Sequence, residues 1–145
     1  MDVKSLPLIK DGWQFNWRKL ASTGQTYVLT TRNTPEIAEG ALCLRIESGM
    51  LFMEALELAP HNVGQKNKRY EHVAGCLIAY ACRESFKTEG EYRGFLGFVS
   101  KTELIHWYVE KYGAKVALGH RLYFDAESGE HLIKEYLYRK KTDQL

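Results

Sequence analysis

The sequence has no long hydrophobic run and no strong excess of one charge. No apolar stretch approaches the length of a membrane-spanning helix, and the first residues, MDVKSLPLIKDGW, lack the apolar core of a signal peptide. The formal net charge is +2, because 20 Lys and Arg offset 18 Asp and Glu. This balance gives no reason to expect a nucleic acid or a membrane surface as a partner. We therefore expect a cytoplasmic protein.

The sequence has few cysteines, and its cysteines and histidines do not show the spacing that is typical of a metal site. The three cysteines, Cys43, Cys76 and Cys82, lie in apolar segments and lack the close paired spacing of a zinc site. The five histidines are scattered and form no two-histidine helix pair. No Gly-x-Ser-x-Gly elbow is present, so covalent catalysis has little support. We expect no metal, and free thiols in a reducing compartment.

What the chain does have is a central stretch from Met50 to Phe86 with three distinct parts. Residues 50–58 are apolar and stop before Pro60, which predicts a buried strand. A polar, basic loop follows, and residues 70–86 then carry apolar side chains at helical spacing. At the start of a helix, unpaired N–H groups and the helix dipole favour an anion. The stretch therefore predicts a site for a phosphorylated cofactor.

The rest of the chain predicts a mixed sheet in a single domain of residues 1–145, with loose ends at 1–12 and 139–145. Alternating or apolar runs predict further strands at 13–17, 27–31, 42–46, 95–99, 116–118 and 121–124. Ser100 is predicted to cap a helix that ends at Gly113, and Ser128 to cap the last helix. Strands 50–58 and 95–99 flank a helix, so they should be parallel neighbours. The predicted fold class is α/β (α+β), with a mostly antiparallel sheet, a central parallel pair and helices on both faces.

The central stretch resembles the GNAT acyltransferase superfamily. That family joins its fourth strand to its third helix with an R/Q-x-x-G-x-G/A signature, which matches residues 69–74, RYEHVA. The resemblance covers residues 50–137, and the E-x-A-P-x-N run from Glu57 to Asn62 looks like a bacterial branch. Three features depart from the family: His72 stands at the first glycine, the loop between Pro60 and Arg69 is long, and residues 20–40 show no helical period for the usual N-terminal helices.

The resemblance implies that acetyl-coenzyme A is the co-substrate. Its pyrophosphate would bind the loop and helix start, and its pantetheine arm would lie where strands 50–58 and 95–99 splay apart. The implied cofactor-binding residues are Leu56, Leu58, Lys68, Arg69, Tyr70, His72, Val73, Ala74 and Gly75.

Two residues are candidates for the chemistry of amide formation from a thioester. Glu57, near the end of a strand, would take the amine proton directly or through water; alternatively it is an edge carboxylate paired with a cation. Tyr108 would protonate the coenzyme A sulfur, since a phenol and a thiol have similar pKa values; alternatively it is a core tyrosine. The family's tyrosine stands four residues before a glycine, whereas Tyr108 stands five before Gly113, with Tyr112 adjacent to that glycine.

The sequence thus predicts an acetyl-CoA-dependent N-acetyltransferase that transfers acetyl to a primary amine by direct attack in a ternary complex. The acceptor is not identified. The alternative is a non-catalytic module that binds coenzyme A or acyl-CoA as a sensor or partner protein. The sequence leaves a homodimer open, in which two copies would pair through an exposed sheet edge or through the open acceptor side.

Overall fold

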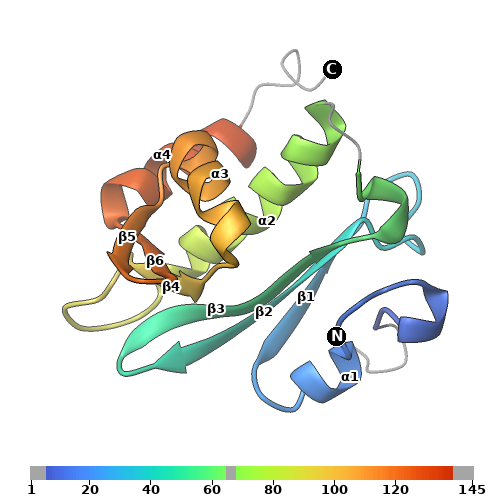
Figure 1. The fold of residues 1–145 in the computed structure, drawn as a ribbon, viewed down its shortest axis with the longest axis horizontal. Coiled ribbons are helices and arrows are strands. Elements are labelled where there is room, and N and C mark those ends of the chain that lie inside the picture. Colours follow the sequence, from blue (N-terminus) through green and yellow to red (C-terminus); the bar gives the residue numbers. More distant parts are fainter. Residues whose placement is uncertain (1–5, 65–67, 139–145) are drawn as a thin grey trace. The chain divides into compact units, whose positions relative to one another are not determined.

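The fold is built on one six-stranded sheet with the strand order β1-β2-β3-β4-β6-β5 (Figure 1). The computed structural model describes residues 6–64 and 68–138. The strands are β1 (Gln25–Leu29), β2 (Gly40–Glu47), β3 (Met50–Leu58), β4 (Leu96–Val99), β5 (Lys115–Leu118) and β6 (Arg121–Phe124). The helices are α1 (Trp17–Leu20), α2 (Lys68–Ser85), α3 (Thr102–Tyr112) and α4 (Ala126–Tyr136), with 3₁₀ turns η2 (Ile9–Asp11) and η3 (Pro60–Asn62).

The predicted mostly antiparallel sheet with a parallel pair is confirmed, with six strands. β1 pairs antiparallel with β2, β6 pairs antiparallel with both β4 and β5, and β3 runs parallel to β4. The parallel ladder joins Leu51–Met53 to Leu96–Phe98, with α2 in the connection. The splay of these two strands stays a prediction.

The chain divides into two compact units, each made of two segments. Unit 1 contains residues 1–45 and 54–77, and unit 2 contains residues 46–53 and 78–145. Both β3 and α2 therefore contribute residues to each unit. That the whole chain acts as a single domain stays a prediction.

In unit 1, the β1–β2 ladder is covered by helices on both faces, as predicted (Figure 1). On one face, Ala41 and Cys43 form a core with Trp13 and Trp17 of the N-terminal segment. On the other face, a Cβ placed on Gly40 would lie 2.8 Å from the side chain of Leu77 in α2. Glycine at this position lets the helix approach the strand closely.

In unit 2, β4 lies inside the sheet, as its uniformly apolar sequence predicts. Phe98 of β4 and Phe124 of β6 are buried, and their rings stack with centroids 5.3 Å apart. β5 is the last strand of the sheet order, and all four of its residues are exposed.

The strand predicted at residues 13–17 is wrong. Residues 9–11 form η2 and Trp17 begins α1, so Trp13 and Trp17 are buried with exposed residues between them. Asn16 caps α1 by accepting a hydrogen bond from the Lys19 N–H at 3.1 Å. The alternation of aromatic and polar residues is typical of a strand, but here the buried residues, Trp13 and Trp17, are four positions apart rather than two.

Both predicted serine caps are also wrong. Lys101 occupies the cap of α3, and the Ser100 hydroxyl donates instead to the Lys101 carbonyl at 2.8 Å. At α4, Asp125 is the cap and accepts a hydrogen bond from the Ser128 N–H at 2.8 Å. The end of α3 is as predicted, because Gly113 adopts the left-handed conformation with φ of +80°.

Candidate functional site at the end of β3 and the start of α2

The carboxylate of Glu57, near the end of β3, accepts three hydrogen bonds from the N-terminal segment. The backbone N–H of Gln14 donates to Oε2 at 2.6 Å, and that of Phe15 donates to Oε1 at 3.1 Å. The indole N–H of Trp17 also donates to Oε1, at 2.9 Å. Since a carboxylate offers about four lone-pair directions, one direction on Oε2 is left beyond these three bonds.

These donors come from a short turn that we call the Trp turn, residues Gly12 to Trp17. Gly12 has φ of +99°, a conformation that favours glycine, and a Cβ there would lie 3.0 Å from the Pro60 ring. Trp13 and Trp17 anchor the turn because their side chains are 7% and 1% exposed. The Trp turn is therefore fixed against β3 and η3 by both packing and hydrogen bonds.

The other end of the E-x-A-P-x-N run makes a second polar connection within unit 1. Asn62 is fully buried, and its Nδ2 donates to the carbonyl of Glu39 at 3.0 Å and to Oε1 of Glu39 at 2.9 Å. His61 Nε2 lies 3.0 Å from the same Oε1. The backbone N–H of Ala59 also donates to the Glu39 carbonyl, at 3.0 Å. The segment after β3 thus holds the residue that precedes β2.

Glu54 and the two leucines that flank Glu57 have other environments. Glu54 forms an ion pair with Arg45 at 2.7 Å. Leu56 is half-buried and Leu58 is buried, and strand alternation directs both to the face opposite Glu57.

The start of α2 holds most of the predicted cofactor-binding residues. α2 begins at Lys68, so the N–H groups without an intrahelical partner belong to the turn that ends near Tyr70. His72, Val73, Ala74 and Gly75 come later, where N–H groups bond within the helix. Val73 and Ala74 are buried, with 6% and 0% exposure. The side chains of Lys68 and Arg69 lie outside the part of the chain that the structure describes.

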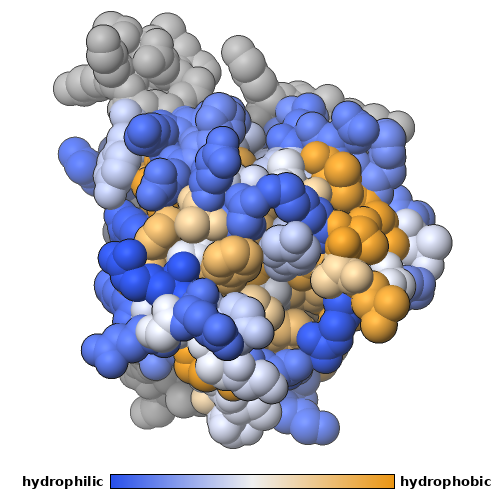
Figure 2. Space-filling view, turned by 90° about the vertical axis from the view of Figure 1, so that its left-hand side faces the viewer, coloured by the Kyte–Doolittle hydropathy of each residue, from blue (hydrophilic) through white to orange (hydrophobic). Residues whose placement is uncertain are grey.

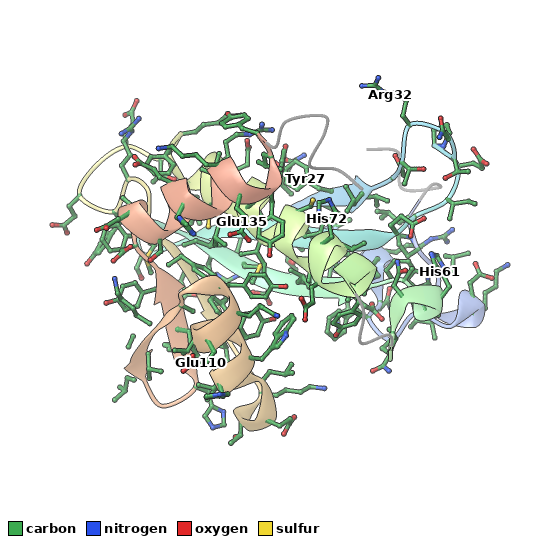
Figure 3. All side chains as sticks on the ribbon, turned by 90° about the horizontal axis from the view of Figure 1, so that it is seen from above. Tyr27, Arg32, His61, His72, Glu110 and Glu135 are labelled. Carbon is green, nitrogen blue, oxygen red and sulfur yellow. The ribbon has the colours of Figure 1, made fainter. Side chains whose placement is uncertain are left out.

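His72, which stands where the family motif has glycine, is half-buried in the first turns of α2. Tyr27 of β1 is opposite Leu42 in the ladder, so it shares the face on which α2 packs over Gly40. Figure 3 labels both side chains on these neighbouring elements of unit 1. The position that a glycine would leave open is therefore occupied by an imidazole.

Tyr108 belongs to unit 2 and lies in an aromatic cluster. It is 8% exposed, and its ring centroid lies 4.8 Å from that of Phe98 and 5.0 Å from that of Trp107. Tyr112 is 3% exposed, and its ring lies 5.0 Å from that of Trp107. Both tyrosines that the sequence offered for acid catalysis are thus packed into this cluster.

Unit 2 also contains a polar groove of about 630 Å³ that the sequence did not predict. The end of α3, Lys115 and residues of α4 line it, among them Glu110 and Glu135, which Figure 3 labels. Lys115 forms an ion pair with Asp125. The hydrogen bond from Lys115, followed by that from the Ser128 N–H, lowers the pKa of Asp125, and the hydrogen bond to Asp125 raises the pKa of Lys115. Acidic and basic residues are mixed along the groove, so its charge selects no ligand class.

The described residues contain neither a metal cluster nor a membrane-spanning helix. Across residues 6–64 and 68–138, no three His, Cys, Asp or Glu side chains gather in a way that would hold a metal ion. Within the same ranges, no helix combines the length and apolar character needed to cross a bilayer.

The six-stranded sheet, with its parallel pair joined through α2, is the GNAT fold. Several solved structures share it, among them the following three. AtaTR bound with AcCoA is 20% identical, with a TM-score of 0.53 over 77% of this chain and 73% of that chain. The KacTA–DNA complex is 18% identical, with a TM-score of 0.57 over 83% and 80%. A tyrosine-to-phenylalanine mutant of the AtaT toxin, bound to the C-terminus of the antitoxin AtaR, is 20% identical, with a TM-score of 0.55 over 77% and 74%.

Neither a family model nor a curated protein matches the sequence. At identities of 20% or below, the likeness to solved structures establishes the fold alone.

Proposed function

We propose that the chain is an acetyl-CoA-dependent N-acetyltransferase that acts on a primary amine. The observation that carries the proposal is the β3–α2 connection within a GNAT fold, where a strand ends at Leu58 and a helix begins at Lys68. The likeness to AtaTR bound with AcCoA supports the same co-substrate. The nitrogen of the amine attacks the thioester carbonyl, the new C–N bond forms, the C–S bond breaks, and the amine proton is released as the thiolate gains one.

Residues at the start of α2 are proposed to hold the coenzyme. The N–H groups of the first helical turn, up to Tyr70, suit the pyrophosphate, and Lys68 and Arg69 supply positive charge. The later residues His72, Val73, Ala74 and Gly75 would shape the wall against the coenzyme through their side chains and compact backbone. The N–H of Leu58 is proposed to donate to the developing oxyanion, with Leu56 beside the acyl arm. When bound, acetyl-CoA supplies the activated acyl group.

Tyr108 is proposed as the acid that protonates the leaving thiolate. The sequence predicts Glu57 as the base, but three donors already hold its carboxylate. A proton taken by Glu57 has to displace a donor or use the open direction on Oε2. We therefore propose that the remaining lone-pair direction on Oε2 of Glu57 orients the amine or a water molecule.

The hydrogen-bonded carboxylate of Glu57 also favours a second candidate function. A GNAT fold without an available base is suited to bind coenzyme A or an acyl-CoA without transfer, as a sensor or partner protein. The buried ring of Tyr108 and the imidazole of His72 in the motif point the same way.

One paired experiment distinguishes the two functions. Free thiol released from acetyl-CoA is measured with a panel of primary amines, beside calorimetric binding of coenzyme A. Thiol release that depends on an amine supports the transferase. Tight binding without release on a broad panel supports the binding module, and an absence of binding overturns both.

Pairing of two copies through β5 is proposed as the oligomeric state. β5 ends the sheet order, and its Val116 and Leu118 are 51% and 79% exposed. Figure 2, which faces the side where β5 lies, shows hydrophobic residues at the surface among hydrophilic ones. An open strand edge with apolar side chains is suited to pair with a like edge. Sedimentation of the wild type and of Leu118→Lys tests this, because only the wild type should dimerise.

The proposed setting is the cytoplasm, and no nucleic acid is proposed as a partner. The KacTA structure contains DNA, but the net charge of +2 in this chain gives no electrostatic reason for the same partner.

A further inference from the structure

We propose that the Trp turn recognises the acceptor, and that Phe15 contacts an apolar or aromatic group next to the amine. The inference rests on the proposed transferase function and names the substrate class that its acceptor side would take. It also changes the role of Glu57, which becomes a positioning residue that holds Phe15 in place.

The first support is that the Trp turn is unusually well fixed for an exposed segment. One carboxylate binds two consecutive backbone N–H groups and an indole N–H, at 2.6, 3.1 and 2.9 Å. Trp13 and Trp17 bury their rings on either side, and Pro60 packs against Gly12. Hydrogen bonds to an ionised group are about twice as strong as neutral ones, so this turn keeps its shape when a ligand arrives.

The second support is what the fixed turn presents. Phe15 lies between the two buried tryptophans in sequence, yet it is 40% exposed. Its ring leans on Trp17, with centroids 6.1 Å apart and planes at 57°. A rigid, partly exposed aromatic ring contributes contact area at little entropic cost when it binds. Core packing does not account for the exposed part of this residue.

The third support is the distance from Phe15 to the proposed chemistry. The Phe15 N–H donates to Oε1 of Glu57 at 3.1 Å, and Oε2 accepts the Gln14 N–H, so the lone-pair count among the described residues leaves one direction on Oε2. An N–H of a neutral amine can donate to that oxygen, which leaves the nitrogen lone pair available for attack on the thioester. The substituent on such an amine would then lie close enough to contact the ring of Phe15. The pair therefore fits primary amines that carry an apolar or aromatic substituent a short distance from nitrogen.

The test compares two amines of similar basicity with the full chain and saturating acetyl-CoA. Phenethylamine offers a ring to Phe15, and propylamine does not. Phe15→Ala should raise the Michaelis constant for phenethylamine about tenfold, with the Michaelis constant for acetyl-CoA and the kcat unchanged. Phe15→Leu should recover part of the loss. Ile9→Ala is the matched control, since Ile9 is 56% exposed and lies outside the Trp turn.

The Glu57→Gln variant tests the positioning role. An amide keeps an oxygen for one donor but turns an NH₂ group toward another, so the turn should shift and the Michaelis constant for phenethylamine should rise. The pH profile of kcat should keep its shape, because Glu57 takes no proton. Loss of the acidic limb of that profile would instead identify Glu57 as the base and overturn the positioning role.

The outcomes separate this inference from the proposed function. If the wild type transfers acetyl to no amine, the proposed function fails and the acceptor assignment fails with it. If transfer occurs but Phe15→Ala leaves the Michaelis constants for both amines unchanged, or raises both equally, only the acceptor assignment is overturned. Unchanged thermal unfolding of Phe15→Ala confirms that the variant is folded.

Discussion

The indole N–H of Trp17 donates to Oε1 of Glu57 at 2.9 Å and so joins two residues that are 40 positions apart in the chain. The bond ties the start of α1 to β3 in unit 1. Trp17 is 1% exposed, and removal of its indole N–H would leave the half-buried carboxylate of Glu57 short of one donor.

Trp17→Phe should therefore lower the free energy of unfolding by about 1.5–3 kcal/mol, the cost of a hydrogen bond to a charged group. The phenyl ring keeps most of the buried apolar surface but has no N–H. Urea denaturation measures the change. Phe15→Leu is the control, and this exposed substitution should stay within about 0.5 kcal/mol of the wild type. Equal stability of Trp17→Phe and the wild type would show that the bond contributes nothing.

Tyr108→Phe should lower turnover by about 10²- to 10⁴-fold if its hydroxyl protonates the coenzyme A thiolate. The fold should be unaffected, because the ring that packs 4.8 Å from Phe98 remains. Tyr112→Phe removes a hydroxyl from the same cluster and serves as the control. A larger loss from Tyr112→Phe would move the acid role to that residue, and full activity of both variants would remove a tyrosine acid from the mechanism.

Asn62→Ala should destabilise the protein by about 1–3 kcal/mol, because the carboxylate and carbonyl of Glu39 lose their amide donor. His61 contacts the same carboxylate from a side chain that is 49% exposed, so His61→Ala should cost less than about 1 kcal/mol. Thermal or urea unfolding of both variants gives the comparison. A larger cost for His61→Ala would contradict the dominant role of the buried amide.

Asp125→Ala should cost about 1 kcal/mol, since Asp125 caps α4 and binds Lys115. Ser128→Ala should have little effect, because only the Ser128 backbone N–H takes part in the cap. Lys115 and the Ser128 N–H lower the pKa of Asp125, so its contribution is present above its ordinary pKa and fades as the pH falls through the lowered value. The difference in stability between wild type and Asp125→Ala should therefore shrink in acid.

Burial raises the pKa of Cys82 from 9.0 to about 12. The native state then keeps a proton that the unfolded chain releases above pH 9, so stability is full below pH 9 and falls as the pH rises toward 12. The slope from this thiol should approach about 1.4 kcal/mol per pH unit. Cys82→Ala should show a shallower fall in unfolding free energy over the same range. Identical slopes would place the thiol in contact with water.

The strands and long helices were predictable because their signals are local. The apolar run of Met50–Leu58 and the helical spacing after Tyr70 fix their own structure, and the parallel β3–β4 pair follows from the connection between them. Gly113 likewise ends α3 by its own backbone conformation. These features need no knowledge of distant residues.

The contacts of the candidate site were not predictable in the same way. Glu57 was placed at the strand end correctly, but its donors are 40 to 43 positions away and two of them are backbone groups with no sequence signature. Asn62 reaches Glu39 across 23 positions. The cap predicted at Ser128 was wrong because Asp125, three residues earlier, offers the acceptor for the Ser128 N–H. Residue preference alone does not choose between the two positions.

The interleaving of the two units limits how this protein can be cut or shortened. Each unit is assembled from two separate lengths of chain, with borders inside β2, β3 and α2. A premature stop after residue 77 would translate all of unit 1, yet it would also carry residues 46–53 without β4, the strand they pair with. No single cut separates the two units, because the segment of unit 2 at residues 46–53 lies between the two segments of unit 1. A fragment that ends at residue 77 therefore contains unit 1 together with a strand segment whose β4 partner is missing.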